Sequence, residues 1–540
     1  MPTPPAPLFS TPPDGGHAAA IRRRPILRSA LTVTSLRGIS SFLSLGTLLL
    51  LAHRFGGEST ETDALFMGRV LSTMLAIQLA RAFSVSLVPV LTRQQITHGD
   101  PHARTCLFHF IAGFGLWLVA ATFLQLALAF PLMRLLGRGF TDAQVFSSSH
   151  IHMMNAPLSL VLGLFAITEA YLNTRGRFAL TEAAALGMPI GTLAGLLVWV
   201  PHLGIMGVPI GTVTGALAGL LMLMLALRQT GPLQATSDFA CPSCRELMPH
   251  FLPVVWGGTA GQISGAVVRS LATTLGVGAV SILQYGERAM GAIPMMAATA
   301  IGKVLLPRLS AEAATGQLRE LGRTVELSIR IMLLVFVPYS AIVTIGNDPL
   351  ADLLFGHGRF GPESVRQVAL VIACFSPSVC CGAITLVLMR TFYALQHSRI
   401  ILTTASAFLV LHISFSYALA GPFGVVGLAA AYSLAFLIQA ILMGVLLHRR
   451  IGKFVGIQEA WWLARCLLAS ILAGVPMLFV EWQWGVDWDR SQPLSAARYL
   501  AALLAYAPLF FALLHVLGIE EVRTVVRRVG RRLRHGGTRS

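Results

Sequence analysis

The amino-acid sequence predicts an all-α integral membrane protein with about fourteen transmembrane helices. Hydrophobic residues make up 55% of its 540 residues and charged residues only 12%. The mean hydropathy of +0.71 is too high for a soluble multidomain protein. Apolar runs of about 20 residues, the length that a helix needs to cross a bilayer, recur along nearly the whole chain. These runs are continuous, whereas a β-barrel requires short segments of alternating polarity.

In chain order, the apolar runs predict helices at residues 28–54, 63–92, 105–130, 150–174, 178–200, 203–227, 246–276, 279–308, 326–346, 365–392, 399–420, 424–448, 459–481 and 496–518. We expect two six-helix lobes around a central cavity, an N-lobe at residues 26–230 and a C-lobe at 245–450. Two more helices follow at residues 459–518. Residues 1–25 are expected to form a cytoplasmic N-terminal segment and residues 519–540 a basic cytoplasmic tail.

A weak internal repeat supports the division into two sets of six helices. Gly68 precedes Pro89 by 21 residues, and Gly286 precedes Pro307 by the same spacing. Each pair lies on the second helix of its set. Two lobes with a binding site between them are a common transporter plan, in which one lobe rocks against the other.

The net charge of +17 indicates membrane topology rather than a nucleic-acid partner. Arginine clusters such as Arg22-Arg23-Arg24 and Arg449-Arg450 fall on alternate connections between the expected helices, and the opposite connections are poorer in Lys and Arg. By the positive-inside rule, this alternation predicts an even number of spans with both termini in the cytoplasm. Membrane lipids are expected contacts, because basic surface clusters attract anionic head groups.

The sequence predicts a transporter with no catalytic residues, cofactor or metal site. A polytopic enzyme needs acid and base groups at its surface, but the connections are short. His357 with Asp348 and Asp352 is the only such grouping that we find in them. The motif Cys241-Pro-Ser-Cys244 supplies two of the four ligands that a structural zinc ion requires, and no second pair completes it.

Several short motifs carry a family resemblance. Tyr285-Gly-Glu-Arg-Ala-Met290 is followed by Leu305-Leu-Pro-Arg-Leu-Ser310. The others are Thr62-Asp-Ala-Leu-Phe66, Ala170-Tyr-Leu-Asn-Thr-Arg-Gly-Arg-Phe178, Gln262-Ile-Ser264, Phe392-Tyr-Ala-Leu395 and Gly424-Val-Val-Gly-Leu-Ala429. In this order and spacing they resemble the MurJ/MviN family of lipid II flippases, which belongs to the multidrug and oligosaccharidyl-lipid exporter superfamily.

This resemblance implies a V-shaped pair of lobes, a cationic central cavity and a groove for a polyprenyl tail near the last two helices. The implied substrate is an undecaprenyl-pyrophosphate-linked cell-wall precursor, lipid II, moved from the inner to the outer leaflet of the bacterial inner membrane by alternating access. The implied role is in peptidoglycan biosynthesis and cell shape, with the cell-wall synthesis machinery as a further expected partner. Alternatives are a flippase for an exopolysaccharide or O-antigen lipid-linked oligosaccharide, and a cation-coupled exporter.

Residue by residue, the resemblance places Arg288 at an essential cavity arginine and Asp63 at the first-lobe aspartate of the family, while Glu287 replaces the usual aspartate. The chain also departs from the family. Residues 39–47 lack the arginines that are usual in the first span, and the signature Glu-Gly-Ala-Phe-Ser of the second span reads Ala80-Arg-Ala-Phe-Ser84. Cations at other positions are therefore expected to rebuild the cavity.

We therefore expect the substrate-binding residues to be Arg288, Glu287, Arg269, Arg81, Arg69, Asp63 and Arg37. Ionisable residues inside a span usually face a polar cavity or each other, because a charge that faces lipid is costly. Arginine suits a pyrophosphate, since its planar fork stays charged and binds two oxygens. The alternative for each arginine is a structural ion pair or a side chain that snorkels to the interface. Glu287 either neutralises Arg288 or Arg269 or takes part in proton coupling.

Overall fold

The computed structural model describes residues 16–231, 255, 259–452, 457–484 and 493–519. Residues 1–15, the Cys241-Pro-Ser-Cys244 motif and the expected basic tail from residue 520 onward lie outside the described residues. Within the described ranges the regular structure is entirely helical. The predicted all-α fold class is therefore confirmed for the described residues.

The first half of the chain forms the helices that we call the N-lobe. These are α1 (Gly16–Phe55), α2 (Thr60–Ala127), α3 (Ala129–Leu136), α4 (Asp142–Asn155), α5 (Leu158–Thr174), α6 (Phe178–Ala185), α7 (Gly187–Ala194), η1 (Gly195–Trp199), α8 (Val200–Leu203), η2 (Gly204–Met206) and α9 (Gly207–Arg228). Within this lobe α5 packs against both α2 and α9, and α7 packs against α9.

The second half forms the C-lobe and a peripheral helix pair. The C-lobe comprises a helix at residues 259–272, η3 (Thr273–Leu275), α11 (Ala279–Ala314), α12 (Leu318–Ile345), α13 (Asn347–Phe355), α14 (Pro362–Ala394) and α15 (Ser398–Ile451). The pair consists of α16 (Ile457–Trp484) and α17 (Pro493–Val516), which pack against each other and against α12.

Nine helical stretches among the described residues are long and apolar enough to cross a membrane, and three of them exceed 50 residues. Each of these three is long enough for two spans. All three are divided at a glycine with positive φ: α2 at Gly99 (φ 83°), the stretch at residues 178–228 at Gly204 (φ 59°) and α15 at Gly424 (φ 55°). With α11 and the helix at residues 259–272, these stretches correspond in order to the fourteen expected helices, although residues 259–272 are only part of the seventh.

Some helix boundaries differ from those that the hydropathy predicts. The fourth span begins with α4 at Asp142 instead of residue 150, and it breaks before α5 because Pro157 has no amide hydrogen for the helical ladder. The expected fifth helix, residues 178–200, is divided into α6, α7 and the short π-helical stretch η1. Hydropathy does not register such breaks, since they leave the apolar character of the run unchanged.

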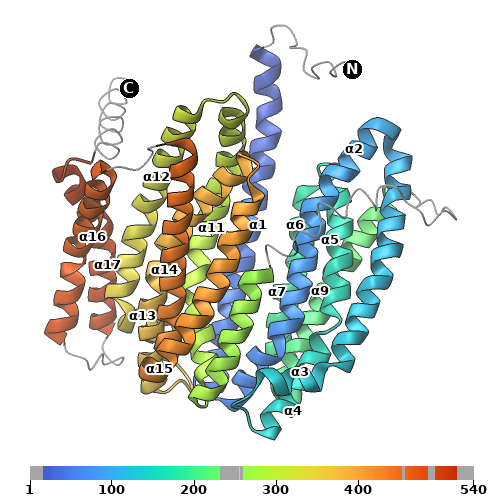
Figure 1. Cartoon of the computed structure of the whole chain (residues 1–540). Helices are drawn as coiled ribbons and strands as arrows, with labels where there is room; N and C mark the ends of the chain where they lie inside the picture. Colours follow the sequence, from blue (N-terminus) through green and yellow to red (C-terminus); the bar gives the residue numbers. More distant parts are fainter. Residues whose placement is uncertain (1–15, 232–254, 256–258, 453–456, 485–492, 520–540) are drawn as a thin grey trace, which may run out of the picture.

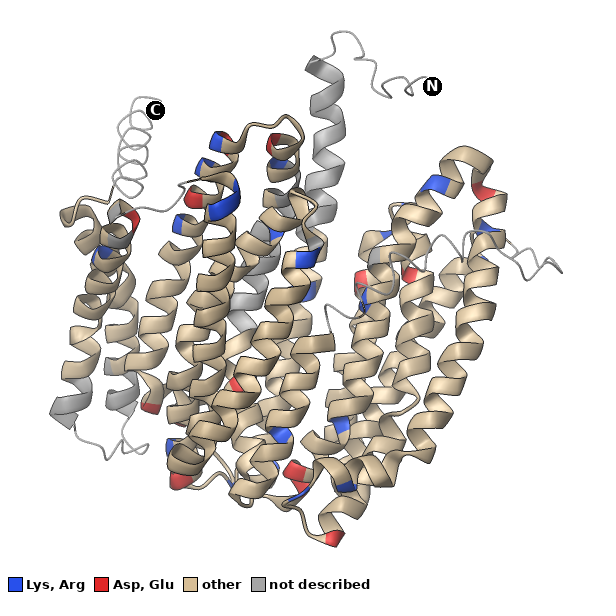
Figure 2. Cartoon of the chain, in the orientation of Figure 1, with Lys and Arg blue, Asp and Glu red and all other residues tan. Residues whose placement is uncertain are grey.

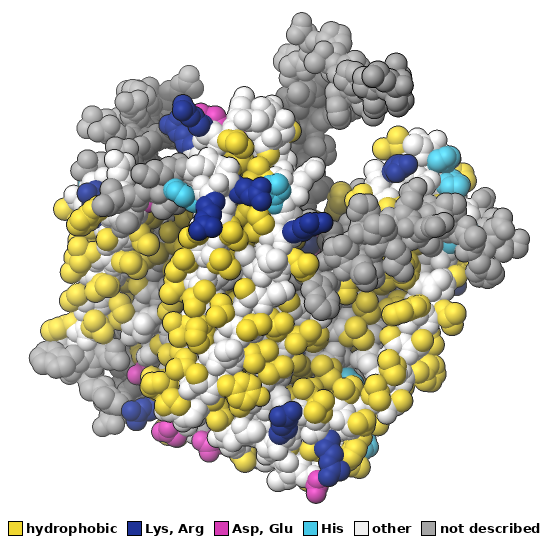
Figure 3. All heavy atoms as spheres, in the orientation of Figure 1, with side chains coloured by type: hydrophobic (Ala, Val, Ile, Leu, Met, Phe, Trp, Pro, Cys, Tyr) yellow, Lys and Arg dark blue, Asp and Glu magenta, His cyan; other side chains and the backbone are white. Residues whose placement is uncertain are grey.

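Figure 1 shows that the two lobes meet at one end and diverge towards the other, with α1 between them. The first described helix begins and the last one ends at the divergent end. We call the opposite end, at which the lobes meet, the distal end. Charged residues gather near the two ends of the helices, with few between them (Figure 2). The surface between these ends is largely hydrophobic (Figure 3), as expected of a protein that is surrounded by lipid.

The two glycines of the sequence repeat occupy equivalent tight contacts in the two lobes. A Cβ atom on Gly68 would lie 2.5 Å from the backbone oxygen of Ser148 on α4, and one on Gly286 would lie 2.4 Å from a side-chain carbon of Val371 on α14. In each lobe, therefore, the second span of the set packs closely on the fourth. The repeat reflects this shared packing.

A second set of glycines holds α7 and η1 against α9. The glycines recur every four residues on both segments, at positions 187, 191 and 195 and at positions 207, 211, 215 and 219. A Cβ atom on Gly211 would lie 2.3 Å from the carbonyl oxygen of Gly191, and one on Gly191 would lie 2.4 Å from the carbonyl oxygen of Gly211. Small residues at this spacing let membrane helices approach until their backbones touch.

We expect Gly211→Ala to lower the thermal stability of the purified protein. The added methyl group forces the two helices apart, and overpacking of this kind costs about 1–3 kcal/mol. Gly113→Ala on α2 is the matched control, because no atom lies within 4 Å of a Cβ atom built there. Equal melting temperatures for the two variants would show that the close contact between α7 and α9 contributes little.

The family-like segment from Ala170 to Phe178 forms a junction with the turn that divides α2. The carboxylate of Asp100 accepts hydrogen bonds from Arg175 and forms an ion pair with Arg104, at 2.6 Å between Nη2 and Oδ2. Partial burial acts to raise the pKa of Asp100, but the hydrogen bonds and charges of these two arginines hold it below its usual value. The junction therefore remains paired at neutral pH and orders this end of the N-lobe.

Candidate substrate-binding site

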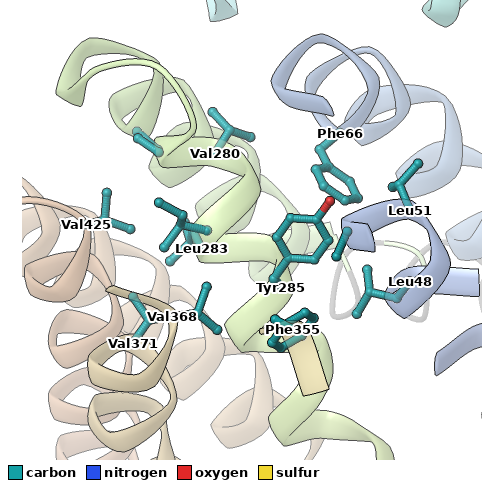
Figure 4. Close-up of a cluster of buried hydrophobic side chains, with 14 of the residues drawn as sticks. Leu48, Leu51, Phe66, Val280, Leu283, Tyr285, Phe355, Val368, Val371 and Val425 are labelled. Carbon is teal, nitrogen blue, oxygen red and sulfur yellow. The ribbon is translucent and has the colours of Figure 1, made fainter. Parts of the chain in front are cut away.

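The lobes meet at the distal end through a large cluster of buried apolar side chains. It combines residues of α1 and α2 with residues of α11, α13, α14 and α15. Tyr285 of α11 lies near its centre with no exposed surface (Figure 4). Its ring contacts Phe66 of α2 edge-on at 5.4 Å between centroids, and it also packs against Phe355 at 5.4 Å and Phe360 at 5.5 Å.

Asp63 of α2 is fully buried at this junction and binds the beginning of α11. Its carboxylate accepts hydrogen bonds from the amide of Gly278 at 2.6 Å, from the amide of Ser281 at 2.8 Å and from the Ser281 hydroxyl at 2.6 Å. The first amides of a helix have no partner within it, and its dipole favours an anion there. The structure thus places Asp63 in a contact between the lobes.

Three further contacts between the lobes belong, together with Asp63, to what we call the distal closure. The Ser270 hydroxyl donates to the carbonyl oxygen of Leu136 at 2.5 Å, and the amide of Gly139 donates to Thr273 Oγ1 at 3.1 Å. Ser364 donates to Glu58 at 3.2 Å. A Cβ atom on Gly139 would lie 2.0 Å from the carbonyl oxygen of Thr273, so only glycine allows the backbones to approach this closely.

Three of the predicted arginines have no ion-pair partner among the described residues. Arg69 and Arg81 lie on α2, and Arg288 lies on α11. Arg81 and Arg288 are exposed, and Arg69 is partly exposed. Arg69 and Arg288 belong to different lobes, yet they are close enough for their charges to repel each other. Among the described residues, the structure therefore brings together two cations from the two lobes that form no ion pair.

Arg269 and Glu287 form an ion pair within the C-lobe. Arg269 Nη2 donates to Glu287 Oε2 at 2.7 Å, and Arg269 Nε donates to Gln284 Oε1 at 3.0 Å. The Arg269 side chain is 16% exposed and that of Glu287 is 41% exposed. Of the two partners considered for Glu287, the structure selects Arg269. Arg288 remains available to another anion.

Arg37 of α1 is also paired. Its guanidinium donates to Glu182 of α6, which is in the same lobe. Glu169 of α5 is near enough to interact with both of these charges, and it accepts a hydrogen bond from Ser84 at 3.4 Å. The structure thus places Arg37 in an intralobe network, where its charge is shared with acids.

A pocket of about 250 Å³ lies inside the C-lobe beside the Arg269–Glu287 pair. Its lining includes three phenylalanines, Tyr432 and His412 of α15. Sequence reasoning missed this residue, whose only signal is its position as a single histidine within the long apolar run that follows Arg399. A larger pocket of about 900 Å³ lies at the distal end beside Arg54, Glu58 and Arg359. Among the described residues, no group of three or more His, Cys, Asp or Glu side chains is placed to hold a metal ion.

Comparison with known proteins identifies relatives along nearly the whole chain. The family model for lipid II flippase MurJ matches residues 51–492. The lipid II flippase MurJ of Burkholderia cenocepacia is 24% identical over 530 residues, which cover 92% of this chain and 98% of the relative. The probable lipid II flippase MurJ of Vibrio cholerae is 24% identical over 508 residues, which cover 89% of this chain and 96% of the relative.

Solved structures show the same fold. A lipid II flippase MurJ in an inward closed conformation matches with a TM-score of 0.74 at 19% identity, covering 90% of this chain and 99% of that one. An inward-facing multidrug resistance MATE family transporter of the MOP superfamily matches with a TM-score of 0.67 at 13% identity, covering 79% and 98%. Both similarities confirm the expected two-lobed transporter fold.

Proposed function

Because the chain belongs to the MurJ family of lipid II flippases, we propose that it moves lipid II from the inner to the outer leaflet of the bacterial inner membrane. It is a multi-pass membrane transporter rather than an enzyme. Its substrate is a lipid-linked glycan, so the protein contributes to peptidoglycan synthesis by translocation, without making or breaking a covalent bond.

The observation that carries this proposal is that Arg69, Arg81 and Arg288 form no ion pair with any residue that the structure describes. A pyrophosphate carries its negative charges on several oxygens, and guanidinium groups bind such oxygens through parallel charge-assisted hydrogen bonds. A site shared between two lobes can follow the substrate as the lobes rock. We propose that Arg69 and Arg288 bind the pyrophosphate from opposite sides. Arg81, which lies further along α2, binds the pyrophosphate of the same substrate at another stage of transport.

The distal closure is one of the two gates that alternating access requires. We propose that the distal end faces the outer leaflet, since the arginine-rich connections then lie in the cytoplasm. In this state the cargo enters between the divergent ends of the lobes, and release requires the contacts of Asp63, Ser270 and Gly139 to separate. We propose this gating role for Asp63 in place of direct contact with the substrate.

Of the other candidate substrates, a cation is disfavoured by the same residues. A cation-coupled exporter needs acids that are free to bind its cargo, whereas Glu287 and Glu182 are both paired with arginines. An exopolysaccharide or O-antigen carrier lipid shares the pyrophosphate, and the arginines do not distinguish it from lipid II. The glycan specificity is therefore a question for growth experiments.

The direct test is replacement of the lipid II flippase in a bacterium that depends on it. We expect expression of this chain to restore growth and cell shape, and to prevent accumulation of lipid II on the cytoplasmic side. A strain that expresses an unrelated polytopic protein at the same level is the control. Failure to support growth at normal membrane abundance would exclude lipid II as the substrate in that host and would favour another carrier-linked glycan.

We expect Arg81→Ala to abolish this growth support while membrane abundance stays normal. The family's first-span arginines are missing at residues 39–47, so Arg81 supplies a cation that the site otherwise lacks. Arg93→Ala is the matched control, because it removes the same charge from the same helix twelve residues away. Normal growth with Arg81→Ala would assign Arg81 to packing or to the membrane interface.

A further inference from the structure

His412 lies in the C-lobe pocket beside the Arg269–Glu287 ion pair. The residue is only 3% exposed, and its Nδ1 atom has no hydrogen-bond partner among the described residues. Its ring packs against Phe408 at 5.5 Å and against Tyr432 at 5.2 Å between centroids. A buried polar nitrogen without a partner is costly. The aromatic packing alone does not account for a histidine at this position.

The charges that surround His412 come from two neighbouring helices. Arg269 lies on the helix at residues 259–272 and Glu287 on α11, and both act electrostatically on the imidazole. From α14 the pocket is lined by Phe375, which carries no charge. From α15, the helix of His412, it is also lined by Tyr432, whose phenol can titrate. Among the described residues that line the pocket, one base, one acid and one arginine therefore face one another.

Building on the proposed function, we propose that His412 is a proton-binding site that controls whether Arg269 is held by Glu287 or is available to the anionic substrate. Histidine can take this role because its ring nitrogen binds a proton reversibly; at this position Glu287 favours the charged imidazolium, whereas burial and Arg269 oppose it. Glu287 is partly exposed, so water and protons reach the edge of the pocket. The site takes up one proton from water, and no covalent bond between heavy atoms changes.

The coupling follows from charge balance in the pocket. With His412 neutral, Arg269 and Glu287 neutralise each other. When a proton binds, the imidazolium competes for the Glu287 carboxylate and weakens its hold on Arg269. Arg269 and Arg288 already interact electrostatically, so the released guanidinium adds to the positive field around Arg288. By linkage, an anion that binds these arginines also favours proton uptake by the same factor.

The test measures anion affinity as a function of pH on the purified full-length protein. Sulfate is the probe, because it stays a dianion from about pH 5.5 to 8 and adds no titration of its own. We expect sulfate to bind about 5-fold or more tightly at the lower pH, which is the smallest factor typical of coupled sites. His412→Gln should remove most of this pH dependence. His150→Gln, on α4 in the N-lobe, should retain it.

Glu287→Gln gives a second and different expected result. It leaves Arg269 without its acid, so sulfate should bind tightly at both pH values with little pH dependence. If His412→Gln does not fold, the pH dependence of sulfate binding in Glu287→Gln tests the proposal instead. Wild-type pH dependence in either variant would overturn the proposal, as would the absence of sulfate binding by the wild-type protein at every pH. The growth test of the proposed function measures transport of the whole lipid in cells, whereas this test measures anion affinity of the purified protein. Either result can therefore fail without the other.

Discussion

Asp63→Asn is expected to abolish growth support and to open the distal end of the protein. An asparagine oxygen cannot accept all three hydrogen bonds that the carboxylate receives, and its NH₂ group then faces the donors of Gly278 and Ser281. Each hydrogen bond to a charged group contributes about 1.5–3 kcal/mol. Loss of about 3–4 kcal/mol shifts the balance between closed and open states by roughly 10²–10³.

The opening is measured by labelling a cysteine at Ala272, which is fully buried in the cluster where the lobes meet. A membrane-impermeant maleimide should modify Ala272→Cys faster in the Asp63→Asn background than in the wild-type background. Labelling of the parent protein without Ala272→Cys gives the contribution of the native cysteines. Asp142→Asn removes an exposed acid from the same end and should leave both labelling and growth unchanged. If Asp63→Asn behaves like this control, the distal closure does not depend on the carboxylate.

The fold could be predicted from the sequence because hydrophobic length is the main requirement for crossing a membrane. The repeat was also informative, since Gly68 and Gly286 are fixed by the same steric contact in the two lobes. The four-residue spacing of the glycines around Gly191 and Gly211 was equally visible in the sequence, although its role became clear only in the structure. Breaks within spans, such as the one at Pro157, depend on local backbone hydrogen bonds.

The candidate site was predictable only as a set of charged residues. Sequence position indicated that Arg69, Arg81, Arg269, Glu287 and Arg288 lie inside spans, but it could not say which of them pair. Arg269 and Glu287 lie on two consecutive helices, 18 residues apart, and the packing angle decides that they meet. The contact of Ser270 with Leu136 uses a backbone oxygen, which every residue possesses. Such contacts leave no signal in a single sequence.

The resemblance placed Asp63 at the first-lobe aspartate of the family, and Arg37 was expected to add a cation to the cavity. In the structure both side chains have partners within the protein. The carboxylate oxygens of Asp63 accept hydrogen bonds from the beginning of α11, and Arg37 forms an ion pair with Glu182. Both differences have the same physical origin. A charge inside a membrane protein is stable only when it is paired or hydrated, and a motif does not reveal which of these applies. Arg288 differs from both, because it is exposed and lacks an ion-pair partner among the described residues.

Arg288→Lys is expected to impair transport strongly in a protein that folds normally. Lysine keeps the positive charge but loses the planar fork that binds two phosphate oxygens at once. The loss of one charge-assisted hydrogen bond, about 1.5–3 kcal/mol, weakens pyrophosphate binding by roughly ten- to a hundredfold.

Arg308→Lys is the matched control on the same helix, since the Arg308 side chain is 65% exposed and pairs with Glu312. The measurements are membrane abundance, melting temperature, affinity for inorganic pyrophosphate and accumulation of lipid II. If Arg288 has a purely structural role, Arg288→Lys should lower membrane abundance and melting temperature, because the guanidinium group would then contribute to the stability of the fold. Full activity of Arg288→Lys at normal abundance would exclude bidentate binding of the substrate by this residue and would leave only its charge as the basis of the site.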